Sequence, residues 1–436
     1  MSSNVASNSK AATWSWALWG WAEHSYPTIM QTFIFATYIT SSYFGTNTDE
    51  LTSQFGLSIA VSGVVVAIFA PVIGRRADQS GRRKRNLLIN SGILIALMFA
   101  SYFVLPDPRY FVFGLVLYSL GAVIQEIAFV NYYAMLKQVS TPSNMARLSG
   151  IAWGLGYVGG IAMLLVALVG FVLPAHPWFG STDAAQNIRI LFVLSGVWML
   201  IFTIPLAIFM PEIPAQAGYQ KTSLAASYRA LFAQLKQLRR EAPDMLRFLI
   251  ASAVFRDGLV GVFQFGAVLG SVAFGFSKTQ VIFYGIAASI VAGIGAIAGG
   301  YVDDLIGTKK TIQVALLGII GFGFYVFAAA PAGQITYWIG GLGLSLFIGP
   351  AQASARTFLA RLAPKDREGE FFGLYQTTGE AASFLAPTLW AVAISTAVAA
   401  GVKDATIYGV LGIVVVLAAG FVLMLRVHPK PEVVNY

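Results

Sequence analysis

The sequence contains no cysteine and only three histidines among its 436 residues. Disulfides and thiolate metal sites are therefore excluded, and because two of the histidines fall in predicted loops we expect no metal site and no cofactor. Charged residues are scarce at 11%, whereas hydrophobic residues make up 57%. No soluble domain of this size hides so much apolar surface behind so few charges. The composition therefore predicts an all-α protein whose helices cross a lipid bilayer.

Signals of enzymes and of nucleic-acid binding are missing too. No nucleophile motif or metal-ligand set occurs, and the basic turn around Gly81 lacks the Lys-Ser/Thr ending of a phosphate-binding loop, so we expect no enzyme. The net charge of +9 matches the excess of Lys and Arg in cytoplasmic loops of membrane proteins, and does not indicate nucleic acid. The first apolar run is too long and too aromatic for a cleaved signal, so we expect it to stay in the mature chain.

Twelve apolar stretches are long enough to cross a bilayer. They lie near residues 15–43, 52–74, 86–105, 110–136, 146–173, 188–210, 245–272, 280–302, 311–330, 334–361, 369–399 and 405–426. With both termini inside, 22 of the 28 Lys and Arg fall in cytoplasmic segments, 4 outside and 2 within spans. The positive-inside rule therefore predicts cytoplasmic termini.

The polar segment between the sixth and seventh spans divides the chain. Its leucines recur at helical spacing beside Lys236, Arg239 and Arg240, which predicts an amphipathic helix on the cytoplasmic surface or one packed on the protein's own loops. We expect a cytoplasmic tail at 1–14, a six-helix bundle at 15–210, a cytoplasmic linker at 211–244, a second six-helix bundle at 245–426 and a cytoplasmic tail at 427–436.

One short pattern occurs twice, 226 positions apart: a Gly, an Asp four residues later and a Gly three residues after that, followed by basic residues. The copies are Gly74, Asp78 and Gly81, and Gly300, Asp304 and Gly307. Each lies between two apolar runs, as a tight cytoplasmic turn would. The duplication also extends to the fifth and eleventh spans, where Ser149-Gly150 and Gly156 match Phe372-Gly373 and Gly379.

The repeated loop resembles the signature loop of the major facilitator superfamily of secondary transporters. That resemblance implies twelve transmembrane helices in two six-helix bundles related by a pseudo-twofold repeat. It also suggests a conformational gate, in which the glycines permit close helix approach and each Asp lies against a helix N-terminus of the opposite half. The alternative is a basic cluster that only directs topology. The gate residues would be Gly74, Asp78, Gly81, Arg82, Gly300, Asp304 and Gly307.

Charges inside membrane spans are rare and usually have a role or a partner. Here they are Glu23, His24, Glu126, Arg256, Asp257, Arg356 and Glu380. Most lie in the first, fourth, seventh and tenth spans, which line the central cavity in the major facilitator arrangement. We expect the arginines to hold an anionic group of a substrate and the acids to bind its cation or a coupling proton. Gln264 and Tyr375 are further candidates as cavity donors.

Other readings of these residues stay open. The charges can pair with one another, and Arg356 can be a cytoplasmic gate residue. His24 beside Glu23 is a candidate proton site, but a single histidine in a membrane helix is more often a hydrogen-bonded structural group. The tryptophans of the first span suggest an interfacial belt, with stacking on an aromatic substrate as the alternative.

Several stretches resemble one branch of the superfamily, the vacuole-effluxer-like transporters. They are Trp16-Ala-Leu-Trp-Gly-Trp21-Ala with Ser25-Tyr26-Pro27, Gly154-Leu-Gly156-Tyr157, Phe255-Arg256-Asp257-Gly258, Gln352-Ala-Ser-Ala-Arg356 and Glu370-Phe371-Phe372-Gly373. The resemblance implies export of small amino acids. The family usually has an Asp before the tryptophan and an Asn after it in span one. This chain has Gly20 and then Glu23-His24, which moves charge within the presumed cavity.

We therefore expect a secondary active transporter that exports small solutes such as amino acids by alternating access, with protons as a candidate coupling ion. The alternatives are efflux of an aromatic, lipophilic or tetrapyrrole-like compound, and a transport-inactive membrane sensor or scaffold. Compact loops favour a bacterial cell (inner) membrane, and we expect a monomer that binds a small-molecule substrate.

Overall fold

The computed structural model describes residues 10–80, 82–139, 145–212, 224–362 and 368–428, and within these ranges all regular structure is helical. Helical segments occupy each of the twelve predicted spans. The described residues form two compact units. Unit 1 comprises those within 1–46, 69–224 and 277–282, and unit 2 those within 47–68, 225–276 and 283–436.

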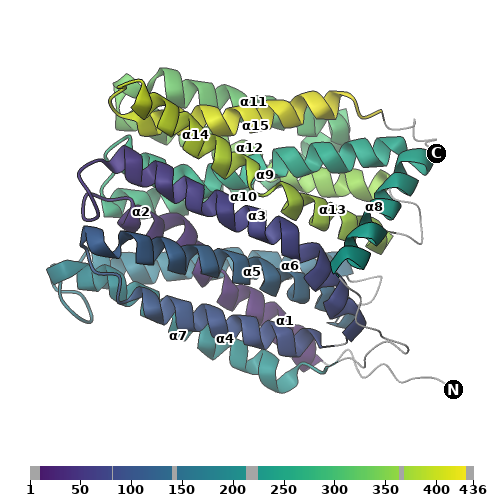
Figure 1. Ribbon diagram of the computed structural model, residues 1–436, viewed down its shortest axis with the longest axis horizontal. Coiled ribbons are helices and arrows are strands. Elements are labelled where there is room, and N and C mark those ends of the chain that lie inside the picture. The colour runs from purple at the N-terminus through teal and green to yellow at the C-terminus, as the bar shows by residue number, and fades with distance from the viewer. Residues whose placement is uncertain (1–9, 81, 140–144, 213–223, 363–367, 429–436) are drawn as a thin grey trace. The chain divides into compact units, whose positions relative to one another are not determined.

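Unit 1 is built on five long helices, with α1 packed against α6 and α7, and α4 packed against α5 and α7 (Figure 1). Its elements are α1 (Lys10–Glu23), η1 (Pro27–Phe33), α2 (Phe35–Ile39), the second part of α3 (Thr48–Ser80), α4 (Arg83–Ser101), η2 (Pro108–Tyr110), α5 (Phe111–Val139), α6 (Met145–Ala167), η3 (Leu168–Val172), η4 (Asp183–Ala185) and α7 (Gln186–Phe209).

Unit 2 has α9 packed against α13 and α15, and α11 packed against α12 and α15. Its elements are the first part of α3, α8 (Leu224–Glu241), α9 (Pro243–Val272), most of α10 (Lys278–Ile306), α11 (Thr308–Ala328), η5 (Ala330–Ala332), α12 (Gln334–Leu362), α13 (Glu368–Ala382), α14 (Leu385–Ala399), η6 (Ala405–Tyr408) and α15 (Gly409–Leu425).

Six helices among the described residues are long and apolar enough to cross a membrane by length and composition alone. They lie within α5, α6 with η3, α7, α10, α11 and α15. Some of the predicted spans that fail this simple test carry charges, such as α9 with Arg256 and Asp257. Membrane segments retain such features where polar chemistry is needed.

The first span is interrupted close to its middle. α1 ends at Glu23, His24 lies in a turn, and the π-helical segment η1 begins at Pro27. Proline has no N–H and clashes with the carbonyl four residues earlier, so an α-helix cannot continue through it unchanged. The break places Glu23 and His24 at the C-terminal end of α1.

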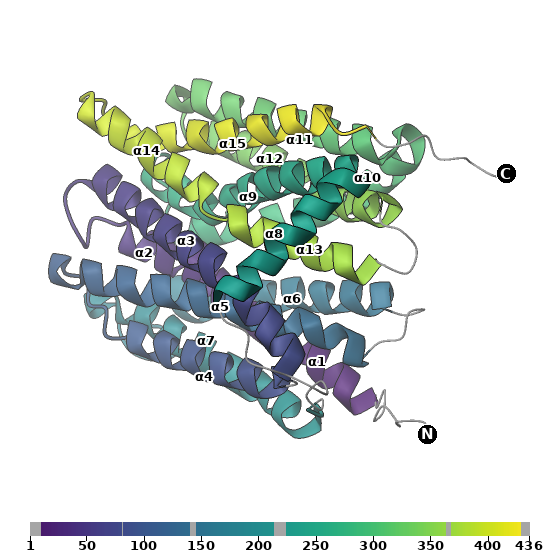
Figure 2. The ribbon, with the colours of Figure 1, turned by 45° about the vertical axis from the view of Figure 1, so that its right-hand side comes forward.

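The eleventh span is also interrupted, and Figure 2 shows α13 and α14 as two ribbons joined by a short connection. A helix that restarts inside a span exposes backbone N–H groups that need acceptors. Asp257 on α9 supplies one, because its Oδ2 accepts a hydrogen bond of 2.6 Å from the backbone N–H of Ala386. The negative carboxylate also complements the positive end of the α14 dipole.

The first part of α3 packs along α14 through a ladder of small and polar residues. Asp49 accepts hydrogen bonds of 2.8 Å from the backbone N–H groups of both Ala405 and Thr406, and so caps η6. One turn further on, the hydroxyls of Ser53 and Ser395 lie 2.6 Å apart. These contacts tie the start of α3 to the end of α14 and the beginning of η6.

Close packing of α10 on α12 depends on two of its glycines. A Cβ at Gly295 would overlap the carbonyl oxygen of Leu346, and a Cβ at Gly299 would come within 2.5 Å of Pro350. The predicted close approach at Gly300 is wrong within unit 2, because no atom there lies within 4 Å of a Cβ at that position. Gly295 and Gly299 are four residues apart and share a helix face, whereas Gly300 is rotated away from that face.

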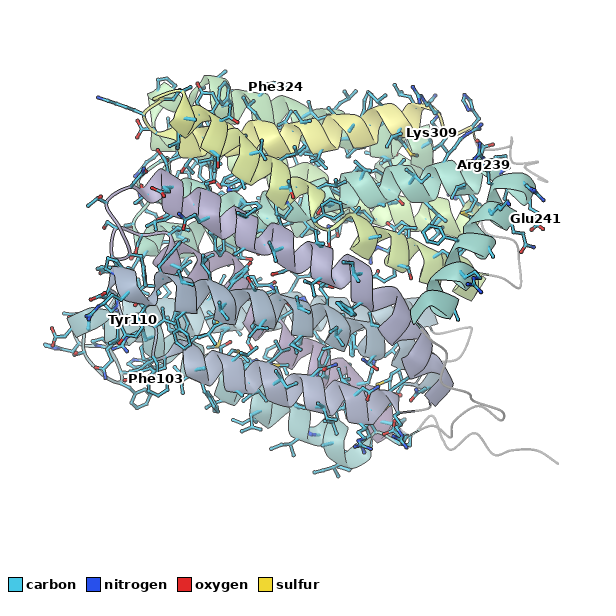
Figure 3. The ribbon with its side chains drawn as sticks, in the orientation of Figure 1. Phe103, Tyr110, Arg239, Glu241, Lys309 and Phe324 are labelled. Atoms are coloured by element: carbon cyan, nitrogen blue, oxygen red, sulfur yellow. The ribbon has the colours of Figure 1, made fainter. Side chains whose placement is uncertain are left out.

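The linker contains the predicted helix, α8, and its leucine-bearing face packs on protein at Leu238, which is buried. The opposite side is cationic, with Arg229, Lys236 and Arg240 exposed. Figure 3 labels Arg239 and Glu241 on α8 together with Lys309 at the start of α11, and all three lie at the same end of unit 2.

Candidate functional site

Among the acids of unit 1 whose side chains the structure describes, Glu23 is the most deeply buried, with 0% of its surface exposed. Glu23 is the last residue of α1, and its Oε1 accepts a hydrogen bond from the side-chain amide of Gln125 on α5. The imidazole Nδ1 of the neighbouring His24 lies 3.2 Å from its Oε2. An acid and a histidine at this distance can share or exchange a proton.

The position of the His24 ring fixes the role of its Nδ1 nitrogen. Nδ1 lies 3.0 Å from the carbonyl oxygen of Gly20, which only accepts hydrogen bonds, so Nδ1 carries the hydrogen. The ring packs against α6, where a Cβ on Gly156 would overlap it, and its centroid lies 5.8 Å from that of Tyr157. Glycine at 156 therefore makes room for the imidazole.

Arg256 is a charged residue inside a predicted span of unit 2, on α9. Its Nη1 donates a hydrogen bond of 2.9 Å to the carbonyl of Tyr375 on α13, and Nη2 contacts Oε1 of Gln376 at 3.4 Å. The guanidinium also lies 4.0 Å above the Tyr375 ring, in a cation–π contact. Among the side chains that the structure describes, no carboxylate forms an ion pair with Arg256.

A glycine also lies beside Arg256. A Cβ on Gly379 would come within 2.8 Å of its Nη1. The internal repeat matches Gly156 with Gly379. Gly156 adjoins the basic side chain of His24, and Gly379 adjoins that of Arg256. The repeat therefore conserves space for a basic group next to the fifth and eleventh spans, although the two groups differ chemically.

The remaining predicted residues are spread along the helices. Glu126 is half-buried on α5, next to Gln125. Gln264 is half-buried on α9, about 12 Å along the axis from Arg256. Arg356 is exposed on α12, where its Nε donates to the carbonyl of Gln352 in the same helix. Glu380 belongs to α13, but its side chain lies outside the described part of the chain.

The predicted gate residues are described only in part. Gly74 and Asp78 belong to the last turns of α3, and Arg82 is exposed directly before α4. Gly307 joins α10 to α11 with a φ of 84°, a conformation that favours glycine. Gly81 and the side chains of Asp78 and Asp304 lie outside the described residues.

The expectation of an interfacial belt is wrong for two tryptophans of the first span. Trp16 and Trp19 are 1% and 0% exposed. The Trp16 ring stacks on Tyr132 with centroids 4.5 Å apart, and its Nε1 donates to the Tyr132 carbonyl. Trp19 donates to the hydroxyl of Ser91. Both rings are packed inside unit 1, because α1 is surrounded there by α5, α6 and α7.

Sequence reasoning missed Gln376 and the hydroxyl of Tyr26, although both contribute polar atoms near the charged residues. A partial signal for Tyr26 was its place one residue before Pro27, where a helix break exposes polar chemistry. No pattern in the sequence distinguishes Gln376 from other polar residues of α13.

Comparison with known proteins bears on the class of this chain. The vacuole effluxer Atg22-like family matches residues 40–430. The MFS-type transporter YxiO of Bacillus subtilis (strain 168), described as uncharacterized, is 26% identical over 355 residues, which cover 80% of this chain and 79% of that protein. Autophagy-related protein 22 of Cryptococcus neoformans is 24% identical over 262 residues, covering 56% of this chain. This chain spans 46% of the length of that fungal relative.

Solved structures show the same fold at low sequence identity. A D-xylose-proton symporter superimposes with a TM-score of 0.71 at 14% identity, covering 98% of this chain and 99% of that one. A mutant of the nucleoside transporter NupG gives a TM-score of 0.67 at 16% identity, covering 95% of this chain and 100% of that one.

The helical architecture and the charged residues inside its spans are those of a multi-pass membrane transporter of the major facilitator class, with twelve transmembrane helices. Its relatives are transporters and not enzymes. Within that class, the chain belongs to the vacuole effluxer Atg22-like family.

Proposed function

We propose that this protein is a secondary active transporter that exports small zwitterionic solutes, amino acids in particular, by alternating access with protons as coupling ion. Its membership of a family of vacuole effluxer-like proteins supports export. The fold supports alternating access, since the structural neighbours include a proton symporter. We further propose a bacterial inner membrane, cytoplasmic termini and a monomer.

The observation that carries the proposal is the half-buried guanidinium of Arg256. Arginine has five N–H donors, and the described contacts of Arg256 engage one or two of them. The remaining donors suit a carboxylate, which arginine binds in a planar, bidentate manner. Glu23 of unit 1 is proposed separately as a group that binds an ammonium or a proton.

The aromatic-efflux alternative receives less support from the structure. Trp16 and Trp19 pack on Tyr132, and Trp21 stacks on Trp198 with centroids 5.5 Å apart. Aromatic rings that already fill one another's contact surface offer little area to a ligand.

The gate remains part of the proposal. We propose that Gly74, Asp78, Gly81, Arg82, Gly300, Asp304 and Gly307 form two turns whose contacts close one side of the transporter. Gly307 supports this idea by its left-handed backbone at the turn.

The deciding experiment is counterflow with the purified protein in liposomes, using pooled amino acids and, separately, aromatic metabolites, each at two pH values. We expect exchange of amino acids. Exchange of aromatic compounds alone would support efflux of that class instead. Absence of any exchange, with the protein folded and inserted, would favour a sensor or scaffold.

Replacing Glu23 by Gln is expected to remove the pH dependence of exchange. A single titrating proton changes a rate by up to about tenfold per pH unit, and the amide cannot bind or release that proton. The measurement is the exchange rate between about pH 5.5 and about pH 8, a range of about 2.5 units. Glu241→Gln is the matched control, because Glu241 is exposed on α8. An unchanged pH profile in Glu23→Gln would remove Glu23 from the coupling mechanism.

A further inference from the structure

Three buried oxygen atoms lie close together in unit 1 without a hydrogen-bond partner among the described residues. They are Oε2 of Glu23, Oε1 of Gln125 and the hydroxyl oxygen of Tyr26. The three residues are 0%, 2% and 1% exposed. Unsatisfied buried polar atoms are rare in folded proteins and indicate an associated water molecule or ion.

The packing of α1 on α5 brings these three oxygen atoms near one another. Gln125 donates its side-chain N–H to the other carboxylate oxygen of Glu23, so its amide oxygen, on the same carbon as that nitrogen, also lies near the carboxylate. Tyr26 follows Glu23 by about one turn, and its hydroxyl fills the space beside Gly121, where a Cβ would overlap it. Gly121 and Gln125 are four residues apart on α5 and share one face, about 6 Å apart. The three oxygens thus come from adjoining turns of two packed helices.

The backbone adds negative potential at the same place. α1 ends at Glu23, and the C-terminal end of a helix carries partial negative charge. Because Pro27 has no N–H, the carbonyl of Glu23 loses the hydrogen bond that a continuous α-helix would provide. Carbonyls at such breaks coordinate small cations in other transporter folds.

The imidazole of His24 does not satisfy Oε2 of Glu23. Nδ1 lies 3.2 Å from that oxygen but also 3.0 Å from the Gly20 carbonyl. The Nδ1–H of His24 points at the Gly20 carbonyl and not at Glu23. Oε2 of Glu23 therefore has no hydrogen bond although Nδ1 is within ion-pair distance of it. Glu23 supplies the one carboxylate of this group of oxygens.

We propose that these oxygens bind one sodium ion, held by the Glu23 carboxylate, the Gln125 amide oxygen, the Tyr26 hydroxyl and the Glu23 carbonyl. Hard oxygen ligands select alkali and alkaline-earth cations over softer metals. A single carboxylate balances one positive charge, whereas a buried divalent ion would keep an uncompensated charge. The described residues contain no cluster of three or more His, Cys, Asp or Glu that would suit a divalent metal.

The binding experiment uses the full chain, purified in detergent, with NaCl replacing choline chloride at constant ionic strength. Intrinsic tryptophan fluorescence and the melting temperature are recorded, since Trp21 and Trp19 lie on α1 close to Glu23. We expect a saturable response to sodium and none to choline. Glu23→Gln should weaken the apparent affinity at least about tenfold, and Tyr26→Phe, the milder change, about threefold.

Asp303→Asn is the matched control in unit 2, because Asp303 is also buried, at 7% exposure, with an oxygen lacking a partner. It should retain the affinity of the wild type. Absence of a saturable sodium response, or equal affinities in Glu23→Gln, Tyr26→Phe and the wild type, would overturn the sodium site. A response to pH without one to sodium would also overturn it, because a proton or a water molecule would then account for the three oxygens.

Sodium binding at this site does not rest on the proposed transport function, which takes the proton as its coupling ion. Sodium binding with no exchange of any solute in liposomes would contradict the transport proposal and leave the site in place. Amino-acid exchange without any sodium response would support the transport proposal and contradict the sodium site.

Discussion

Replacing Arg256 by Ala is expected to lower amino-acid exchange about 100-fold. Loss of one partner from a buried, hydrogen-bonded charge contact costs about 2–5 kcal/mol, and about 1.4 kcal/mol corresponds to a factor of ten. Arg256 holds its guanidinium above Tyr375 and donates to the Tyr375 carbonyl, so it is fixed before a substrate arrives. Such preorganisation means that little ordering entropy opposes binding. The measurement is counterflow of the best amino acid in liposomes.

Arg247→Ala serves as the control on the same helix. Arg247 is exposed and pairs with Asp244 at 2.8 Å, a contact of the kind that contributes little in solvent. We expect Arg247→Ala to exchange substrate at nearly the rate of the wild type. Arg256→Lys separates charge from geometry, because lysine keeps the charge but cannot form the planar, bidentate contact. If Arg256→Ala transported as fast as Arg247→Ala, Arg256 would not be the carboxylate partner.

Replacing Gly295 by Ala is expected to lower stability by about 3 kcal/mol. A methyl group there would overlap the carbonyl oxygen of Leu346, and a backbone atom cannot move aside as the tip of a flexible side chain can. Overpacking of a tight interface typically costs about 1–3 kcal/mol, and α10 would have to separate from α12. The melting temperature of the purified protein reports this loss.

Gly293→Ala is the matched control, because no atom lies within 4 Å of a Cβ at that position. Ala is a better helix former than Gly by up to about 1 kcal/mol, so this variant should melt at or above the wild-type temperature. Equal melting temperatures for the two variants would show that α10 and α12 do not pack as closely as the structure indicates.

Breaks within spans were not predicted, although one of them had a signal. Pro27 is a possible signal of a helix break. Proline also occurs inside continuous helices of this protein, however, at Pro205 in α7 and Pro350 in α12. Whether a proline breaks a helix depends on whether its surroundings satisfy the freed carbonyl. That condition depends on tertiary neighbours, so periodicity cannot reveal it.

The roles of the charged residues also depend on tertiary neighbours that the sequence does not reveal. Asp257 and Arg256 are adjacent in sequence, and both stood as candidates for binding or coupling. In the structure Asp257 caps α14, whereas Arg256 contacts Tyr375 and Gln376 of α13. Successive residues of a helix point about 100° apart, so adjacent charges face different partners.

The sequence by itself determined the number of spans, the membrane class and the family resemblance, because hydropathy, spacing of repeated motifs and charge counts are properties of the linear chain. The pairing of Gly156 with Gly379 was also visible as a repeat. Only the tertiary structure decided that each of these glycines adjoins a basic side chain, that Trp16 and Trp19 are interior, and that Glu23 meets Gln125. Contacts between helices depend on rotation about each helix axis and on the residues of the neighbouring helix, and neither is encoded in local composition.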